Sequence, residues 1–330
     1  MTQKQQPLDS GFTAASTAAD VVKGIDLWGR NVIVTGGHVG LGLETTRALA
    51  AAGASVVVGT RNPDRAAPAL DGIERVQVER LDLMDPASVD AFAARYTASG
   101  RPLHVLVNNA GIMESQLARD ARGYESQFAT NHLGHFQLSN ALLPALRAAN
   151  GARVVALSSW GHHLSDIRWD DPDFETGDYD GMVAYGQSKT ANVLFAVELD
   201  RRWSGDGIRG YSLHPGSIVG TNLAPSLTID DQRAMGLVDE AGRPIIDPAR
   251  GMKTPEQGAS TTVWGATSPL LNDVGGVYLM DNDVATIDEA TVGFDIASGE
   301  LDTTGGVMPY AVDPESAQRL WELSEQLLKA

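Results

Sequence analysis

Short runs of β-branched residues alternate along the chain with longer stretches rich in alanine and leucine, beginning near residue 31. Most of the short runs are continuously apolar and lack the polar alternation of a half-exposed strand. This pattern is typical of parallel strands that are covered on both faces. It predicts strands at 31–35, 55–60, 75–79, 103–108, 152–158 and 207–214.

The stretches between these strands have helical length and composition. They predict helices at 40–52, 86–99, 124–150, 182–203 and 255–267. Four of the helices are followed by a glycine, the residue that commonly ends a helix: Gly53, Gly100, Gly151 and Gly205. Because strands alternate with helices, we predict an α/β fold in which helices cover both faces of a doubly wound, mostly parallel sheet.

No linker or internal repeat divides the chain. We therefore expect an N-terminal arm over residues 1–24, loose apart from a short helix near its end, and one folded domain over residues 25–330. Two segments interrupt the rhythm: 160–181 is acidic and rich in turns, and 217–254 mixes glycine, proline and apolar residues. Both follow predicted strand ends, where open α/β sheets bind ligands, so we expect both on the substrate side.

The amino-acid composition excludes several kinds of partner and site. The 330 residues include 25 lysines and arginines against 42 aspartates and glutamates, which gives a formal net charge of −17. Such a surface repels nucleic acid and anionic membranes, and we expect neither as a partner. The absence of cysteine excludes disulfides, thiolate metal sites and cysteine nucleophiles. Since no signal-peptide core or long apolar stretch is present, we expect a soluble cytoplasmic protein.

A glycine-rich turn joins the first predicted strand to the first long helix. Gly36, Gly40 and Gly42 follow Thr35 in the segment VTGGHVGLGLE. A helix that begins near Gly40 directs unpaired N–H groups and its positive dipole end at the turn, which favours a bound pyrophosphate. Because the motif lies between a strand and a helix, we interpret it as a dinucleotide site and not as an ordinary turn.

The spacing Thr-Gly-x-x-x-Gly-x-Gly resembles that of the short-chain dehydrogenase/reductase superfamily. Further residues agree with that family in order and register: Asp82, the NNAG segment 108–111, Asn131, Ser159, Tyr185, Lys189 and the HPG segment 214–216. The chain most resembles retinol-dehydrogenase-like bacterial oxidoreductases. Three segments carry this likeness: SSWGHH, AYGQSKTANVLFAVEL and SLHPG. The resemblance implies a Rossmann domain with a seven-stranded sheet, and a homo-oligomer that pairs through the helix carrying Tyr185 and Lys189.

The resemblance also implies a nicotinamide cofactor. Gly36, Gly40 and Gly42 would hold the pyrophosphate, Asp82 the adenine amino group, and Asn109 would stabilise the sheet beside the nicotinamide ribose. Asp82 and Asn109 have ordinary alternatives as a turn acid and a loop amide. The expected cofactor-binding set is Gly36, His38, Gly40, Leu41, Gly42, Arg61, Asp82, Leu83, Asn109, Ala110, Gly111, Tyr185, Lys189, Pro215, Gly216 and Ile218.

The end of the second strand bears on the choice between NADP and NAD. It reads Gly59-Thr60-Arg61, so no carboxylate is present for a ribose 2′-hydroxyl, and a guanidinium there suits a 2′-phosphate. We expect NADP, with NAD as the alternative in which Arg61 is a solvated surface residue. The family's other NADP marker, a basic residue before the second glycine, is absent because Val39 stands there, and the neighbouring His38 is at most partly charged.

Tyr185 and Lys189 are four residues apart on a predicted helix, so their side chains share one face. A free phenol with a pKa of about 10 is a poor base at neutral pH, and a nearby ammonium favours the phenolate. We therefore predict that Tyr185 is the general acid/base in the interconversion of a carbonyl and an alcohol. By the resemblance, Lys189 also binds the nicotinamide ribose, Ser159 holds the substrate oxygen, and Asn131 holds a water that links Lys189 to solvent.

Several of these residues have alternatives. Ser158 competes with Ser159 for the substrate oxygen, and Asn131 is otherwise an amide inside a helix. His162 and His163 are adjacent and lack the spacing of metal ligands, so we expect no metal.

Other classes of protein explain less of the sequence. A hydrolase would need a Gly-x-Ser-x-Gly elbow, which is absent, and a dehalogenase or methyltransferase does not account for Tyr185 with Lys189. The alternative to an NADP-dependent alcohol dehydrogenase or carbonyl reductase is a non-catalytic, dinucleotide-sensing regulator on the same fold.

The apolar content of segment 217–254 bears on the substrate. It includes Ile218, Leu223, Leu227, Ile229, Met235 and Leu237, without a clear helical stripe. These side chains either pack on the domain or form a lid, and the lid interpretation predicts a largely apolar ketone or secondary alcohol. The threonine that the family places after the Pro–Gly pair is displaced by one position, to Thr221.

Overall fold

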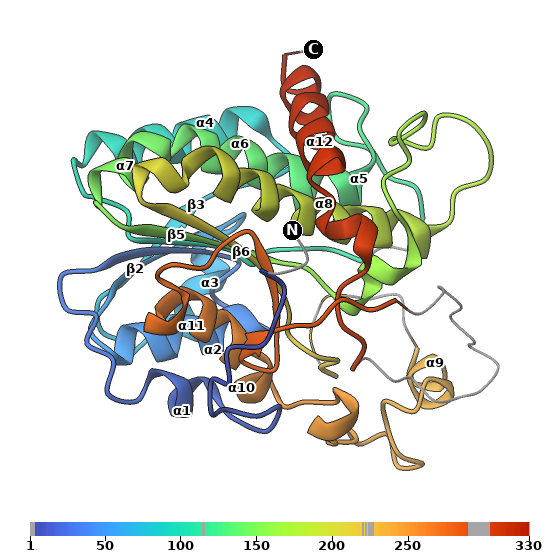
Figure 1. Ribbon diagram of the computed structural model, residues 1–330, viewed down its shortest axis with the longest axis horizontal. Coiled ribbons are helices and arrows are strands. Elements are labelled where there is room, and N and C mark those ends of the chain that lie inside the picture. The colour runs from blue at the N-terminus through green and yellow to red at the C-terminus, as the bar shows by residue number, and fades with distance from the viewer. Residues whose placement is uncertain are drawn as a thin grey trace.

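Helices lie on both sides of one sheet in the computed structural model (Figure 1). The structure describes residues 4–113, 116–219, 221, 223, 228–289 and 304–329. Within these residues, eight strands lie in the order β3-β2-β1-β4-β5-β6-β7-β8. Their bounds are β1 Asn31–Thr35, β2 Ser55–Thr60, β3 Val76–Arg80, β4 Val105–Asn108, β5 Ala152–Leu157, β6 Ile208–His214, β7 Val277–Met280 and β8 Asp283–Val284.

The predicted α/β fold with a doubly wound, mostly parallel sheet is confirmed. Neighbouring strands are parallel from β3 across to β7, and the pairing of β7 with β8 is antiparallel. The short strand β8 makes the sheet one strand larger than the predicted seven. It follows β7 after a turn at Asp281 and Asn282, both of which have positive φ.

The α-helices differ in length from one turn to six. Their bounds are α1 Ala18–Val22, α2 Gly40–Ala51, α3 Pro63–Leu70, α4 Pro86–Ala98, α5 Ser126–Phe128, α6 Gly134–Ala141, α7 Leu143–Ala148, α8 Gly181–Trp203, α9 Ile229–Ala234, α10 Pro255–Gly258, α11 Ser260–Thr267 and α12 Pro314–Leu327. A π-helical turn, η1 Ala129–Leu133, joins α5 to α6, and a 3₁₀ turn, η2 Trp160–Leu164, follows β5. None of the helices in the described residues combines the length and apolar character needed to cross a membrane.

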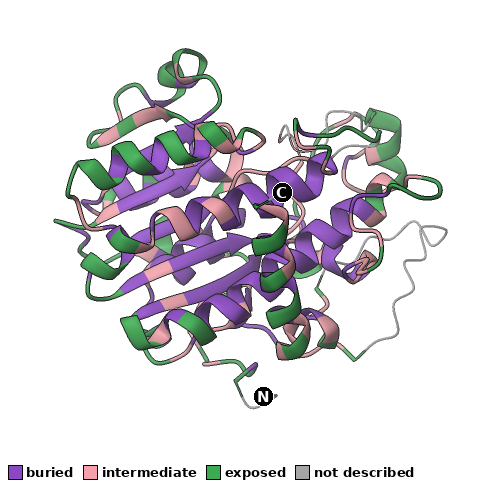
Figure 2. Ribbon diagram, turned by 90° about the horizontal axis from the view of Figure 1, so that it is seen from above, coloured by how far each residue is buried: buried purple, intermediate pink, exposed green. Residues whose placement is uncertain are grey.

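Each face of the sheet has its own hydrophobic core. On β1, Val32 and Val34 pack toward the side of α1, α2 and α11, whereas Ile33 packs toward the side of α4, α6 and α8. Successive residues of a strand point to opposite faces, so a strand covered on both sides is apolar throughout. Figure 2 shows the result, with buried strands between helices whose outer faces are exposed.

The helix predicted at 124–150 is interrupted. Glu125 caps its start, the π-helical turn follows α5, and α6 ends at Leu142 before α7 begins. Pro144 lies in the first turn of α7, where its missing N–H costs no helical hydrogen bond. The helix predicted at 255–267 is likewise divided into α10 and α11. Helices α3, α9 and α12 were not among the predicted helices.

The N-terminal residues are anchored, so the prediction that the arm is loose is wrong for residues 4–17, whereas the short helix expected near its end is present as α1. The amide of Gln5 donates to the carbonyls of Tyr278 (2.7 Å) and Ala285 (2.6 Å), and its oxygen accepts from Tyr278 N (3.0 Å). Ala18 and Val21 of α1 lie in the hydrophobic core. The segment therefore closes one edge of the sheet.

The C-terminal helix α12 packs along α8. Its Trp321 is 3% exposed and lies edge-on to Phe136 of α6, with ring centroids 4.8 Å apart. The same indole stacks on Phe195 (5.9 Å) and meets Trp203 edge-on (5.6 Å), both on α8. One face of the long helix α8 is thus covered by the chain's own C-terminal helix.

Trp321→Ala should lower the free energy of unfolding by about 3–5 kcal/mol, because it empties a packed aromatic cluster. Urea or guanidinium unfolding measures the change. Trp28→Ala is the matched control: Trp28 is 68% exposed and contacts the guanidinium of Arg75 (4.2 Å), so its loss should cost less than about 1 kcal/mol. Equal losses for the two variants would contradict the role of α12.

Candidate active site

A cavity of about 640 Å³ opens at the carboxyl ends of the parallel strands. The strand order reverses between β1 and β4, and open α/β sheets bind their ligands at such a reversal. Every predicted cofactor and catalytic residue except Asn131 lines the cavity. Lining residues that the sequence analysis did not propose include Asn62, Arg65, Met84, Ile112 and Thr130.

The glycine-rich turn is packed closely against the end of β4. Gly36 has φ +65°, and a Cβ on it would lie 3.2 Å from Cβ of Ala110. A Cβ on Gly42 would collide with the backbone of Gly36 and lie 2.6 Å from Nδ2 of Asn109. No side chain caps the start of α2, which leaves its first N–H groups to a ligand. The turn therefore fits a pyrophosphate at a helix N-terminus.

Asn109 joins the ends of β4 and β1. Its side-chain amide donates to the carbonyl of Thr35 (2.8 Å), and the backbone N–H groups of Asn109 and Ala110 donate to Thr35 Oγ1 (both 2.9 Å). This agrees with the sheet-stabilising role that the resemblance implied for Asn109. Thr35 is the centre of the arrangement, although its spacing in the sequence gave no sign of it.

Two arginines lie at the end of β2. Arg61 and Arg65 both line the cavity and are exposed, and neither forms an ion pair within the described part of the chain. His38 lies across the turn, where burial and the charge of Arg61 lower the pKa of its imidazole. Asp82, two residues after β3, accepts a hydrogen bond from Met84 N (3.1 Å), as a turn acid does, and also lines the cavity.

Helix α8 carries Tyr185 and Lys189 on one face, both only 4% exposed. The Lys189 ammonium lies 5.4 Å from the centroid of the Tyr185 ring and donates to the carbonyl of Leu157 (3.2 Å). Burial lowers the pKa of Lys189 to about 8 and raises the pKa of Tyr185 to about 12, the latter opposed by a hydrogen bond with Ser159. Burial thus moves each group toward its neutral form.

The two serines at the end of β5 have different partners. The Ser158 hydroxyl donates to the carbonyl of Lys189 (2.8 Å), a contact within the fold. The Ser159 hydroxyl accepts from Gly161 N (3.0 Å) and contacts Tyr185. A Cβ on Gly161 would lie 2.8 Å from the Tyr185 ring, so this glycine lets the ring approach η2. The geometry favours Ser159 over Ser158 as the partner of Tyr185.

Asn131 lies behind the cavity, on the π-helical turn. Its side chain accepts from Ile112 N (2.9 Å) and donates to Ile112 O (3.0 Å) and Ser188 Oγ (2.9 Å). The amide thus ties the segment after β4 to α8, one residue before Lys189. Functional helices often carry such π turns.

His162 and His163 have separate partners and do not converge. His162 contacts the carbonyl of Ser159 (2.6 Å), whereas Nε2 of His163 lies 3.2 Å from the Asp288 carboxylate. Across the described residues, no three side chains of His, Asp or Glu gather into a group that would hold a metal ion.

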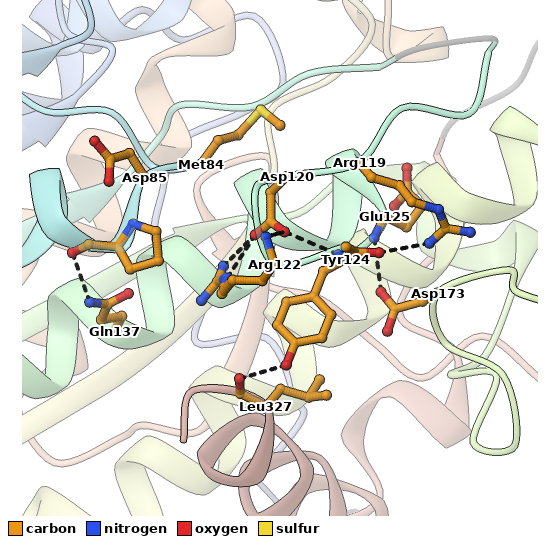
Figure 3. A network of polar contacts seen from close by, with 12 residues as sticks. Met84, Asp85, Arg119, Asp120, Arg122, Tyr124, Glu125, Gln137, Asp173 and Leu327 are labelled. Atoms are coloured by element: carbon orange, nitrogen blue, oxygen red, sulfur yellow. Dashed lines mark hydrogen bonds and ion pairs between the residues drawn. The ribbon is translucent and has the colours of Figure 1, made fainter. Parts of the chain in front are cut away.

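The two substrate-side segments differ in what they contribute. Ile218, Thr221 and Leu223 of segment 217–254 line the cavity, whereas no residue of 160–181 does. Segment 160–181 instead supports the helical segments that carry Asn131 and Tyr185. Asp173 accepts from Glu125 N (2.8 Å), as Figure 3 shows.

Glu125 connects this segment to the helix that carries Asn131. Its buried carboxylate caps Gln127 N (2.9 Å) and Phe128 N (2.7 Å) and accepts from the Tyr179 hydroxyl (3.0 Å). Tyr124 beside it reaches α12, where its hydroxyl donates to Leu327 O (2.8 Å; Figure 3). The acidic segment thus has a positioning role that its composition did not indicate.

Several known proteins are similar to this chain in sequence. The family model for short chain dehydrogenase matches residues 30–170. A "Probable oxidoreductase" of Streptomyces antibioticus is 46% identical over 93% of this chain and 100% of its own length. Retinol dehydrogenase 12 of Bos taurus is 35% identical over 92% of this chain and 88% of its own length.

Solved structures of other proteins have a similar fold. A crystal structure of a protein from Mycobacterium paratuberculosis matches with a TM-score of 0.70 at 33% identity, covering 96% of this chain and 98% of that one. The NADP complex of RhlG from Pseudomonas aeruginosa matches with a TM-score of 0.59 at 25% identity, covering 78% and 96%. The chain therefore belongs to the short-chain dehydrogenase/reductase family of oxidoreductases, as the sequence predicted, and is close to its retinol-dehydrogenase-like members.

The pKa of Lys189 predicts a pH dependence of stability. Between about pH 8 and pH 10.5 the folded lysine has lost its proton while the unfolded lysine keeps it, so the cost of burying the charge disappears and stability rises with pH. Lys189→Met lacks this gain. The free energy of unfolding of the wild type minus that of the variant should grow by roughly 2–4 kcal/mol across the window.

Urea unfolding at several pH values measures this difference, and the exposed Lys23 changed to Met is the control. A difference that stays constant from about pH 8 to pH 10.5 would contradict the burial of a charged Lys189.

Proposed function

We propose that this chain is an NADP-dependent alcohol dehydrogenase or carbonyl reductase, with Tyr185 as its general acid/base. The observation that carries the proposal is that Tyr185, Lys189 and Ser159 line the same cavity as the glycine-rich turn. A proton donor, a cation and a hydroxyl in one cavity with a dinucleotide turn support proton transfer to a substrate held beside the cofactor. Nothing in the site favours the non-catalytic regulator.

The cofactor fits the residues that surround the cavity. Gly36, Gly40 and Gly42 would hold the pyrophosphate, Asp82 the adenine, and Lys189 the nicotinamide ribose. When bound, the nicotinamide would supply or accept the hydride, and in its oxidised form it would add a positive charge to the site.

Three side chains of the protein transfer and stabilise the proton that accompanies the hydride. In reduction, Tyr185 donates its phenolic proton to the carbonyl oxygen, and in oxidation it takes the proton from the alcohol. The Lys189 ammonium stabilises the phenolate, and the Ser159 hydroxyl hydrogen-bonds the reacting oxygen. We assign Asn131 the role of holding the proton path from Lys189 to solvent.

The cofactor preference rests on the end of β2. Arg61 and Arg65 are two guanidiniums without carboxylate partners in the described residues, and they suit a ribose 2′-phosphate. The RhlG structure, which holds NADP, supports the same choice. NAD is the alternative cofactor.

The substrate proposal rests on segment 217–254. Ile218 and Leu223 line the cavity, and the carbonyl of Leu223 accepts from Met113 N (3.0 Å), which joins this segment to the end of β4. We propose that the segment forms a lid that excludes water from a largely apolar ketone or secondary alcohol. Leu227 lies outside the described residues.

A cytoplasmic homo-oligomer remains our proposal for location and assembly. Because α12 packs along α8, a second copy that pairs there would have to contact α12 as well.

Tyr185→Phe should keep the fold and NADPH binding but lower kcat by about 10²–10⁴, because the proton donor is lost. Steady-state absorbance of the reduced nicotinamide with a panel of carbonyls measures it. Tyr211→Phe is the control, since its buried hydroxyl bonds Leu271 O (2.7 Å) away from the cavity. Activity of the Tyr185 variant within about twofold of wild type would overturn the assignment.

Arg61→Asp should shift the preference from NADPH toward NADH by roughly 2–4 kcal/mol, because a partner of the 2′-phosphate becomes a repelling charge. The ratio of kcat/KM for the two cofactors measures the shift. Arg30→Asp makes the same charge change at the amino end of β1 and should leave the ratio unchanged. An unchanged ratio in Arg61→Asp would make Arg61 a surface residue.

Catalytic efficiency should rise with apolar size in a matched series of ketones at fixed NADPH, because larger substrates contact Ile218 and Leu223. Leu223→Ser should flatten that rise and change the smallest ketone least. If catalytic efficiency is highest for a charged keto acid, the lid proposal is wrong. The oxidoreductase assignment does not depend on this result.

A further inference from the structure

His135, on α6, is bonded at both of its ring nitrogens although it lies outside the cavity. Its Nε2 is 2.9 Å from Thr35 Oγ1, and its Nδ1 is 2.9 Å from the carbonyl oxygen of Asn131. The residue is 2% exposed, and burial lowers the pKa of its imidazole to about 4. The ring is therefore neutral at physiological pH, with one nitrogen as donor and the other as acceptor.

The partners determine which nitrogen carries the proton. Thr35 Oγ1 already accepts two backbone N–H groups, from Asn109 and Ala110. Its own proton must be donated, and His135 Nε2 at 2.9 Å is nearer than Val107 O at 3.4 Å. His135 Nε2 is thus the acceptor, and Nδ1–H donates to the carbonyl of Asn131.

The hydrogen bonds continue from Asn131 to the catalytic helix. Its side chain donates to Ser188 Oγ (2.9 Å), and the Ser188 hydroxyl donates to the carbonyl of Tyr185 (2.7 Å). Thr35 immediately precedes Gly36, the first glycine of the turn. Two sets of hydrogen bonds, one on the main-chain carbonyl of Asn131 and one on its side chain, therefore link the nucleotide turn and His135 to the segment of α8 that carries Tyr185 and Lys189.

We infer that His135 is a positioning residue that couples the nucleotide turn to the catalytic helix. Its two nitrogens fix the Thr35 hydroxyl on one side and the Asn131 carbonyl on the other. An inference about catalysis rests on the proposed function, but the coupling itself does not. Because the ring is buried and does not line the cavity, it holds other groups in place and exchanges no proton with the substrate.

The neighbouring His132 provides a matched control. It lies three residues earlier, is equally buried, contacts Ser324 Oγ of α12 (2.8 Å) and interacts with Asn192 of α8, and neither partner belongs to the nucleotide turn. Replacing either histidine by phenylalanine keeps a ring in the core and removes its polar contacts. A general loss of stability should appear in both variants, whereas a loss of coupling should appear only in His135→Phe.

The experiment compares His135→Phe with His132→Phe. The dissociation constant of NADPH, from fluorescence titration, should rise about threefold to tenfold in His135→Phe, and kcat should fall about tenfold, the effect of one buried hydrogen bond. The apparent pKa of the kcat/KM profile should rise, because Lys189 is less firmly held beside Tyr185. His132→Phe should leave the dissociation constant of NADPH unchanged, and should change kcat and the pH profile less than His135→Phe does, because Asn192, its partner on α8, also donates to the Leu157 carbonyl (2.9 Å) that holds Lys189.

Two further variants each restore a polar group at only one of the two ring-nitrogen positions of His135. Gln at position 135 offers an acceptor near the place of Nε2, so His135→Gln should recover NADPH affinity more than kcat. Asn offers a donor near the place of Nδ1, so His135→Asn should recover kcat and the pH profile more than NADPH affinity. Equal behaviour of all the His135 variants and His132→Phe would overturn the inference.

If the wild type reduces no carbonyl, the proposed function fails and the NADPH titration alone decides the inference. An affinity in His135→Phe no weaker than in His132→Phe would then exclude the coupling.

Discussion

A buried ammonium is the constraint on which the rest of the site depends. Lys189 lies in the interior with the Leu157 carbonyl and the face of Tyr185 around it. A charge removed from water is tolerated only where its surroundings are rigid and well bonded. Helix α8 meets this need, because Asp180 caps its first N–H groups, Ser158 bonds its middle and α12 covers its outer side.

The sheet was the most predictable part of the molecule. Strands β1 and β2 agree with their predicted bounds, since a strand buried on both faces is marked by its own apolar run. The interruption at η1 and α6 was not predictable, because it depends on partners distant in sequence such as Ile112. Helix α12 was missed for a related reason, in that its burial is set by aromatic rings on α6 and α8.

The residues of the candidate site also fall into those that the sequence could predict and those that it could not. Tyr185 with Lys189, and the three glycines, are local spacings, and local spacings can be read without a structure. Thr35, Arg65 and Gly161 lie in or beside the cavity for reasons that only the folded chain provides, namely contacts with other strands, helices or rings. Segment 160–181 shows the limit of composition, because its acidic residues serve as caps and hydrogen-bond acceptors for catalytic helices.

The anchoring of Gln5 has a consequence for how the molecule folds. Its partners Tyr278 and Ala285 lie more than 270 residues away in sequence. Contacts of such separation form late, because the loop they close is long and its ends must first be organised. During synthesis Gln5 emerges long before these partners, so its hydrogen bonds cannot form until β7 and β8 exist. Gln5 is therefore made early and reaches its final position late.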